Sequence, residues 1–294
     1  MCRISDLVIR STRKLQPAYP AKEARAMVYQ LLQHYAGLSR TQLYACPEQK
    51  LPHDLMEKIE AAIDDLLTNK PLQYITGEAE FCGLPFMVNG SVLIPRPETE
   101  ELVRLAVQAL RTLQRPNTPL RVLDLCTGSG CIAVSVAAQL PAVSVAACDV
   151  SEEALEVAQR NAQRHHARVD FFPCDILRQP EAPAAHLAPA SVQAIVSNPP
   201  YVRRSEQSLM QPNVLRYEPH LALFVDDDDP LVFYRAIASL ARQYLAPNGF
   251  VLVEINEALA DATARVFRSA GYPDTAVKED LNGKNRFVAT NCIF

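Results

Sequence analysis

The fold of this chain is decided by one stretch, Leu123-Asp124-Leu125-Cys126-Thr127-Gly128-Ser129-Gly130-Cys131-Ile132-Ala133. An apolar run is followed by a glycine-containing turn and then by the start of an apolar helix. This order is typical of the first strand-to-helix crossover of a doubly wound α/β fold, whose ligands bind at the carboxyl ends of the strands. Gly128 and Gly130 allow the backbone to approach a ligand closely. A dinucleotide-binding fingerprint has a third glycine where Ala133 stands, so the stretch favours a smaller nucleoside ligand.

Around this stretch, the sequence alternates between apolar strands and amphipathic helices. The predicted strands are Val122–Cys126, Val143–Cys148, Val169–Phe172, Val192–Ser197 and Phe250–Ile255. The predicted helices are Cys131–Leu140, Glu152–Arg164, Leu231–Leu245 and Ala258–Ala270, with caps at Ser151 and at Asp229-Pro230. Such alternation predicts a mostly parallel sheet covered on both faces. Finally, Thr275–Val277 and Arg286–Thr290 flank an Asn-Gly pair, which indicates an antiparallel hairpin.

The N-terminal part of the chain has a different character, because its apolar residues recur with helical spacing. Helices are predicted at about Ala21–Tyr35, which Gly37 ends, and at His53–Leu67. Residues 81–88 then indicate a short hairpin with Gly83 at its turn. We therefore expect a helical domain over residues 1–72, a hairpin linker over 73–92, and an α/β domain over 93–294.

Length and composition are those of an ordinary globular protein of one large or two modest domains. The chain has 294 residues, of which 49% are hydrophobic and 21% charged, and its net charge is −4. The absence of a basic excess disfavours a duplex nucleic-acid binder. No apolar run approaches the ~18 residues that span a bilayer, and the N-terminus lacks the order of a signal peptide, so we expect a cytoplasmic protein. The 8 cysteines lack metal-binding spacing, which predicts reduced thiols and no metal site.

Acidic residues mark the ends of the second and third predicted strands. Asp149 stands where an acid can bind both hydroxyls of a ribose, although it could also simply flank the helix that Ser151 caps. Asp175 could accept a hydrogen bond from an adenine amino group, with Ile176 against the ring. Asp124 lies inside the first strand, where a carboxylate could orient the loop or hold a cationic ligand.

The next predicted strand ends in Asn198-Pro199-Pro200-Tyr201. Each proline fixes φ at about −65° and has no N–H, so the backbone is stiff and its carbonyls are free to accept hydrogen bonds. The Asn198 side chain adds one acceptor and one donor group, and Tyr201 adds a flat face. We interpret this corner as a grip for a planar amino group, with a strand-ending turn as the alternative. Strand ends in this order are typical of S-adenosylmethionine-dependent methyltransferases that act on planar nitrogen, either adenine amino groups or glutamine amides.

Four further stretches narrow the choice of methyltransferase. They are Leu72–Gly77, Ile94-Pro95-Arg96-Pro97-Glu98-Thr99-Glu100, Arg216–Leu223 and Asp280–Arg286. With them, the chain resembles the bacterial peptide chain release factor glutamine methyltransferases, the HemK/PrmC family. The resemblance implies a helical N-terminal domain that recognises release factors, a hairpin linker, and a Rossmann-like, seven-stranded class I methyltransferase domain. It also implies methyl transfer from S-adenosyl-L-methionine to the side-chain amide nitrogen of the glutamine in the Gly-Gly-Gln loop of release factors.

The strand-end residues and the resemblance together predict roles residue by residue. The predicted cofactor-binding residues are Cys126, Thr127, Gly128, Ser129, Gly130, Asp149, Asp175, Ile176 and Asn198, with Arg96 and Thr99 from a stiff lip. The predicted catalytic residues are Asn198, Pro199, Pro200 and Tyr201. The Asn198 side-chain carbonyl and the Pro199 backbone carbonyl are expected to accept the two amide N–H bonds, while Tyr201 packs on the amide. We expect a monomer that binds release factors and has no direct contact with nucleic acid or membrane.

Two departures from the family pattern carry their own expectations. Cys126 replaces the usual first glycine of the cofactor loop, and we expect it in a β or right-handed helical conformation with slightly altered cofactor affinity. The run Asp226–Asp229 replaces a glycine-containing loop, and we expect a solvated loop and helix cap rather than a metal site.

Three alternatives remain open. One is an adenine amino-methyltransferase on nucleic acid. Another is a glutamine methyltransferase of ribosomal protein L3, a group that typically has Pro-Arg-Ser-Pro where this chain has Pro95-Arg96-Pro97-Glu98. The third is a non-catalytic scaffold that binds the cofactor.

Overall fold

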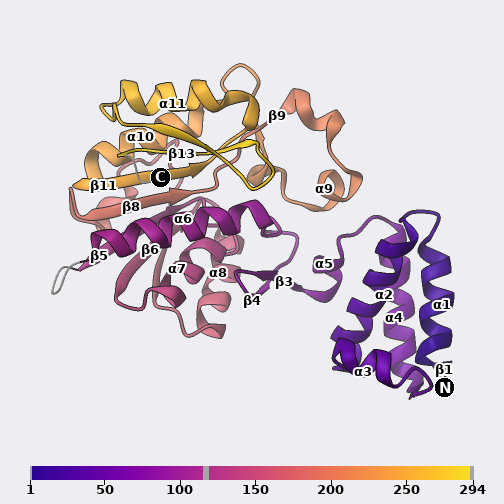
Figure 1. The fold of residues 1–294 in the computed structure, drawn as a ribbon. Helices are drawn as coiled ribbons and strands as arrows, with labels where there is room; N and C mark the ends of the chain where they lie inside the picture. The colour runs from indigo at the N-terminus through magenta and orange to yellow at the C-terminus, as the bar shows by residue number, and fades with distance from the viewer. Residues whose placement is uncertain (1, 115–118, 292–294) are drawn as a thin grey trace. The chain divides into compact units, whose positions relative to one another are not determined.

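The computed structural model describes residues 2–114 and 119–291. The chain forms two compact units, one built from residues up to 77 together with 211–217, and the other from 78–210 together with 218 onward. Figure 1 shows that the first unit is helical and that the second is a sheet with helices on both faces. Each unit has its own buried apolar core. Within the described ranges, no helix combines the length and the apolar character that crossing a membrane requires.

The first unit is a bundle in which five helices pack around one apolar core. These helices are α1 (Ile4–Leu15), α2 (Ala21–Ala36), α3 (Arg40–Ala45), α4 (His53–Leu67) and α5 (Leu72–Thr76), and the unit also includes α9 (Pro212–Tyr217). Its strands β1 (Cys2–Arg3) and β2 (Lys50–Leu51) pair antiparallel. Leu7, Leu31 and Leu66 are fully buried between the helices. The sequence predicted α2 and α4 to within one residue, because their apolar positions repeat with helical spacing.

Helix α9 joins this unit from far along the chain, which the sequence did not indicate. Tyr217 ends α9, and its hydroxyl lies 2.6 Å from Thr68 Oγ1 and donates to the Thr68 backbone carbonyl at 3.2 Å. A contact between such distant segments leaves no periodic signal in either of them. The first unit is therefore discontinuous in sequence.

The second unit is organised by a sheet whose described strands follow the order β12-β13-β11-β8-β5-β6-β7. The strands are β5 (Leu120–Leu125), β6 (Val143–Asp149), β7 (Val169–Pro173), β8 (Val192–Ser197), β11 (Leu245–Glu254), β12 (Ala276–Glu279) and β13 (Asn285–Ala289). Neighbours from β11 to β7 are parallel, whereas β13 pairs antiparallel with both β11 and β12. The predicted seven-stranded α/β sheet with an antiparallel end is confirmed among the described residues.

Helices cover both faces of this sheet (Figure 1). On one face, α6 (Pro97–Leu113), α7 (Cys131–Gln139) and α8 (Glu152–Arg164) share a core cluster with Val122. On the other face, α10 (Val232–Tyr244) and α11 (Ala260–Ser269) share a cluster with Leu123. Consecutive residues serve opposite faces because side chains alternate along a strand. The carboxyl ends of β5, β6, β7 and β8 remain at one edge, where a ligand can reach them.

The predicted hairpin is formed by β3 (Glu78–Phe81) and β4 (Leu84–Met87). Phe81 and Phe86 are fully buried and meet edge to face, with ring centroids 5.9 Å apart. They belong to the same core cluster as α6 and α7, so the hairpin packs within the second unit. Cys82 and Gly83 form the two-residue turn with φ of 50° and 73°, the positive values that a type I′ turn requires.

Short elements complete the second unit. Strands β9 (Val202–Arg203) and β10 (Phe224–Val225) pair parallel, and short 3₁₀-helices span Ala182–Ala185, Arg204–Leu209, His220–Ala222 and Glu257–Leu259. The predicted helix cap at Asp229 is wrong, because α10 begins after Leu231 and Asp229 forms an ion pair with Arg235 instead. Asp226 also has an arginine partner, Arg204, at 2.7 Å.

Candidate active site

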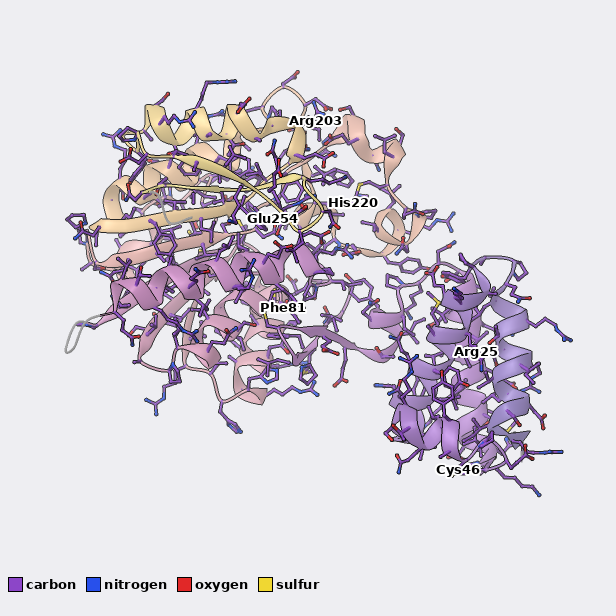
Figure 2. The ribbon with its side chains drawn as sticks, viewed as in Figure 1. Arg25, Cys46, Phe81, Arg203, His220 and Glu254 are labelled. Carbon is purple, nitrogen blue, oxygen red and sulfur yellow. The ribbon has the colours of Figure 1, made fainter. Side chains whose placement is uncertain are left out.

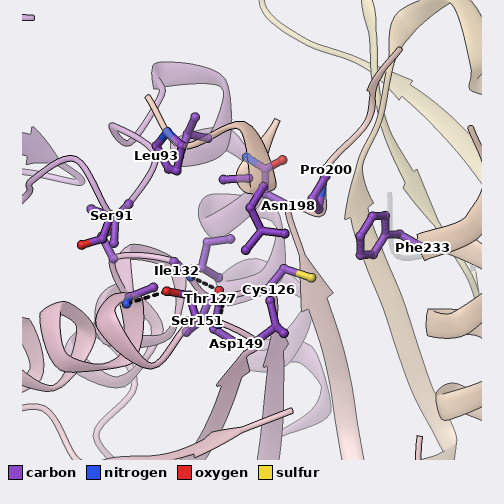
Figure 3. A pocket seen from close by; sticks show the side chains of 18 of the residues that line it. Ser91, Leu93, Cys126, Thr127, Ile132, Asp149, Ser151, Asn198, Pro200 and Phe233 are labelled. Atoms are coloured by element: carbon purple, nitrogen blue, oxygen red, sulfur yellow. Dashed lines mark hydrogen bonds between the residues drawn. The ribbon is translucent and has the colours of Figure 1, made fainter. Parts of the chain in front are cut away.

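The ends of four neighbouring strands line one pocket at the carboxyl edge of the sheet (Figure 3). Thr127 follows β5, Asp149 ends β6, Asp175 follows β7 and Asn198 follows β8. The pocket volume of about 420 Å³ lies within the range of ~300–1,000 Å³ that is typical of small-molecule sites. The structure therefore brings residues of the glycine turn (residues 126–130) and of the asparagine corner (residues 198–201) to a single cavity.

Most of the residues singled out in the sequence line this pocket. The predicted cofactor residues found there are Arg96, Thr99, Cys126, Thr127, Gly128, Ser129, Asp149, Asp175, Ile176 and Asn198. Gly130 lies outside the lining. Of the predicted catalytic residues, Asn198 and Pro200 line the pocket, whereas Pro199 and Tyr201 lie outside it.

Backbone hydrogen bonds fix the conformation of the glycine turn. The Thr127 N–H donates to the Cys148 carbonyl at 3.0 Å, and the Gly130 N–H donates to the Thr127 carbonyl at 2.9 Å. Gly130 has a φ of 77°, and a Cβ there would lie 2.9 Å from the Cβ of Ala158 on α8. Gly130 therefore permits the close packing of α8, whereas Gly128, with a φ of 53°, borders open space.

Cys126 adopts the left-handed conformation, with a φ of 59°. The expectation of a β or right-handed helical conformation at this position is therefore wrong. A residue with a Cβ is strained in this region by ~1–3 kcal/mol, whereas glycine is not. The turn enforces the conformation because the residues on either side are fixed by the sheet and by the hydrogen bonds of the turn. Burial raises the pKa of the Cys126 thiol well above its usual range, which keeps the thiol neutral.

Asp124 orients the glycine turn from inside the sheet. It is completely buried, and its Oδ2 accepts from the Thr127 hydroxyl at 2.6 Å and from the Ala133 N–H at 3.2 Å. Its other oxygen has no hydrogen-bond partner in the described part of the chain. Burial raises the pKa of Asp124 to about 7. Asp124 was expected either to orient the loop or to hold a cationic ligand, and its hydrogen bonds to Thr127 and Ala133 are those of a residue that orients the loop.

Asp149 connects the glycine turn with the start of α8. Its Oδ2 accepts from the Gly128 N–H at 2.8 Å, and its Oδ1 accepts from the Ser151 N–H at 3.0 Å. Ser151 caps α8, as predicted, because its hydroxyl oxygen accepts from the Ala154 N–H. Each oxygen of Asp149 keeps a further lone pair for a ligand hydroxyl. Burial raises the pKa of Asp149.

Apolar side chains and one further acid form the wall beyond Asp149. The Oδ1 of Asp175 accepts from the Leu177 N–H at 2.9 Å. Ile176 is buried, whereas Val150 and Leu177 line the pocket and remain 48% and 41% exposed. Partly exposed apolar side chains at a pocket gain from covering the flat face of a ligand.

Asn198 reaches the pocket from the end of β8, beside Pro200 (Figure 3). Its side-chain Nδ2 donates to Thr99 Oγ1 at 3.1 Å. Thr99 lies in the first turn of α6 and is only 2% exposed. Tyr201 directs its hydroxyl toward Glu254 and donates to Oε1 at 2.9 Å. The corner is therefore tied to α6 and to β11.

Sequence reasoning missed Glu254, which ends β11 inside the second unit (Figure 2). It is 1% exposed, and its Oε2 accepts from the Thr99 hydroxyl at 2.7 Å. Burial raises the pKa of Glu254, although hydrogen bonds from Thr99 and Tyr201 oppose that rise. The sequence could have indicated Glu254 as a site residue, because a carboxylate at the end of an apolar strand is buried and requires hydrogen-bond partners there.

The lip of the pocket is held by Glu218, whose side chain is fully buried. Glu218 accepts from the Ile94 N–H at 3.1 Å and from the Arg96 guanidinium at 2.5 Å. This pairing joins two of the stretches on which the family resemblance depends, residues 94–100 and 216–223. Pro95 and Pro219 line the pocket on this side and stiffen the lip.

The pocket fits the nucleoside-bearing cofactor that the resemblance implies. Gly128 has no side chain and borders open space, Asp149 offers acceptors, and Ile176 and Leu177 offer apolar surface. These are the kinds of groups that hold a ribose and a purine ring.

Two family models match separate parts of the chain. Residues 6–77 match the family model described as the PrmC N-terminal domain. Residues 104–216 match the model described as the Methyltransferase small domain. Among solved structures, that of the hMettl16 catalytic domain in complex with MAT2A 3′UTR hairpin 6 has a TM-score of 0.53 at 12% identity and covers 81% of this chain and 82% of that one. At this identity the likeness supports the fold alone.

Two relatives, each named release factor glutamine methyltransferase, match nearly the whole chain. The protein of Flavobacterium psychrophilum is 41% identical over 278 residues, covering 94% of this chain and 95% of its own. The protein of Bacteroides thetaiotaomicron is 42% identical over 291 residues, covering 99% of this chain and 100% of its own. With this identity over nearly full length, the chain belongs to the release factor glutamine methyltransferase family.

Proposed function

We propose that this protein transfers a methyl group from S-adenosyl-L-methionine to the side-chain amide nitrogen of the glutamine in the Gly-Gly-Gln motif of peptide chain release factors. One observation carries the proposal. Asn198, with its amide nitrogen bound to Thr99, lines the same pocket as the glycine turn and Asp149. Membership of the family supplies the identity of the acceptor.

The cofactor would be held by the ends of three strands. Asp149 would accept hydrogen bonds from the ribose hydroxyls, and Asp175 would accept one from the adenine amino group, with Ile176 against the ring. Gly128 and its neighbours in the turn would bring backbone groups against the amino acid portion. When bound, S-adenosylmethionine supplies an electrophilic methyl group on a positively charged sulfur.

The task of the protein is to orient the amide. An amide nitrogen is a poor nucleophile because its lone pair is delocalised into the carbonyl. The Asn198 Oδ1 and the Pro199 backbone carbonyl would accept its two N–H bonds and fix the direction of the nitrogen. Accepting these bonds also disperses the positive charge that grows on nitrogen during transfer, and orientation alone can lower the barrier by several kcal/mol. The proton can leave to water afterwards, so no residue needs to act as a base.

The first unit is proposed to recognise the release factor. It has its own apolar core, and residues 6–77 match the PrmC N-terminal domain. We further propose that the protein acts as a monomer in the cytoplasm without direct contact with nucleic acid, in keeping with its net charge of −4.

The test is a methyl-transfer assay with purified components. The protein is incubated with isotope-labelled S-adenosylmethionine and a purified bacterial release factor, and the Gly-Gly-Gln peptide is analysed by mass spectrometry. We expect one methyl group on the glutamine side chain and none on a release factor whose glutamine is replaced by alanine. Duplex DNA and ribosomal protein L3 serve as parallel acceptors. Transfer to either of these, without transfer to the release factor, would overturn the proposal.

A further inference from the structure

Glu254 is a buried carboxylate that the proposed mechanism leaves without a role. It ends β11, and the register pairs Val253 on that strand with Ser197 on β8. Glu254 and Asn198, the next residues along the chain, are therefore neighbours at the carboxyl ends of these adjacent parallel strands. The two oxygens of Glu254 accept from the hydroxyls of Thr99 and Tyr201. Both hydroxyl protons are thus committed to the carboxylate.

The direction of these hydrogen bonds decides which way the Asn198 carboxamide faces. An ionised carboxylate only accepts hydrogen bonds, and a hydroxyl has a single proton to donate. Because Thr99 gives its proton to Glu254, its oxygen can only accept a bond from Asn198. The amide nitrogen of Asn198 must then face Thr99 at 3.1 Å. Its oxygen is left without a partner in the described part of the chain, and Asn198 lines the pocket.

We propose that Glu254 and Thr99 are positioning residues that fix the orientation of the Asn198 carboxamide, so that the pocket presents an acceptor to the NH₂ group of the substrate. The inference rests on the proposed function, because only an amide or amino substrate requires an acceptor there. A flipped Asn198 would present a donor to a donor and would repel the substrate amide.

The stretch Asp280–Arg286 contains a cation, Arg286, that interacts electrostatically with Glu254. Arg286 donates from Nε to Asp280 Oδ2 at 3.1 Å, and Asp280 also accepts from the backbone of Asn282 and Lys284. Burial raises the pKa of Glu254, and the hydrogen bonds from Thr99 and Tyr201 together with the positive charge of Arg286 oppose that rise. The hairpin turn thereby places one cation where it favours the ionised, acceptor-only form of Glu254.

The test compares two substitutions at Thr99. Thr99→Val keeps the shape of the side chain and removes the hydroxyl, whereas Thr99→Ser keeps the hydroxyl. We expect Thr99→Val to lower kcat for the release factor by about tenfold or more, a larger factor than the change in the dissociation constant for S-adenosylmethionine measured by calorimetry. Thr99→Ser should restore most of kcat.

A spectroscopic readout follows Asn198 in the free protein. The side-chain NH₂ signal of Asn198 is assigned by its loss in Asn198→Asp, and it should shift in Thr99→Val but not in Thr99→Ser. Glu254→Gln should shift the same signal, because glutamine offers an oxygen to only one of the two hydroxyls. Thr290→Val is the matched control, since Thr290 accepts from the Val251 N–H within the sheet and does not line the pocket. It should leave both the signal and kcat unchanged.

The outcomes separate this inference from the proposed function. If the wild-type protein methylates the release factor while Thr99→Val keeps both kcat and the Asn198 signal, the inference is overturned. If the Asn198 side-chain NH₂ signal does not shift in Glu254→Gln, Glu254 does not help to orient Asn198. If the wild-type protein fails to methylate any release factor, the proposed function fails, and the NMR comparison still decides whether Thr99 orients Asn198.

Discussion

Replacing Asp124 by asparagine should change how the stability of the second unit depends on pH. Asp124 is completely buried beneath the glycine turn, and one of its oxygens has no partner among the described residues. Burial raises its pKa from 3.8 to about 7. Because the folded pKa lies above the unfolded one, the folded state holds a proton that the unfolded state has already lost. Stability is therefore lost as the pH rises from about 4 to about 7.

The size of the effect follows from the pKa difference. A rise from 3.8 to about 7 corresponds to ~4 kcal/mol of unfolding free energy as an upper bound. In Asp124→Asn the side chain cannot ionise, yet it keeps one oxygen that can accept from Thr127 or Ala133. The stability of wild type relative to Asp124→Asn should therefore fall between pH 4 and pH 8 by up to that amount.

The assay follows urea unfolding by pulsed hydrogen exchange and mass spectrometry of peptides from β5 and β8, which report on the second unit alone. Asp228→Asn, at an exposed position in the acidic loop, is the control, and its difference from wild type should vary little over the same range. If the wild-type and Asp124→Asn curves run parallel across this range, the buried carboxyl does not titrate as described.

Three substitutions test the glycine turn and the end of β6. Cys126→Gly should raise the unfolding free energy by ~0.5–1 kcal/mol in urea titration, because relief of the strain at a φ of 59° is partly offset by the backbone entropy that glycine loses on folding and by the lost packing of the side chain; a loss of stability would contradict that balance. Gly130→Ala should cost ~2 kcal/mol or more, since its Cβ would lie 2.9 Å from that of Ala158, and an unchanged unfolding midpoint would contradict that packing. Asp149→Ala should weaken S-adenosylmethionine binding by about tenfold or more in calorimetry, and an unaltered dissociation constant would remove the ribose assignment.

The sheet and its helices were predictable because their signals are local. Parallel strands are buried on both faces and read as apolar runs, and the predicted bounds of β8 and α8 agree with the structure to the residue. Ser151 marks the start of α8 through a hydrogen bond only three residues long in sequence. The strand ends that line the pocket follow from the same alternation.

The parts that could not be predicted depend on contacts between distant residues. Tyr217 joins the first unit through Thr68, and Glu254 meets Thr99 and Tyr201, across separations that leave no periodic pattern. The conformation of Cys126 is imposed by a turn whose hydrogen bonds reach the next strand. Tertiary structure sets these features, whereas the residue types alone allow several outcomes.

The central claim is that the Asn198 carboxamide orients the substrate amide and that the neighbouring loops hold the cofactor. Its most direct test measures methyl transfer to a release factor and cofactor affinity side by side in Asn198→Ala. The account predicts that kcat falls by ~100-fold or more while the dissociation constant for S-adenosylmethionine stays within ~2-fold. Equal losses in both quantities, or transfer at the wild-type rate, would contradict it.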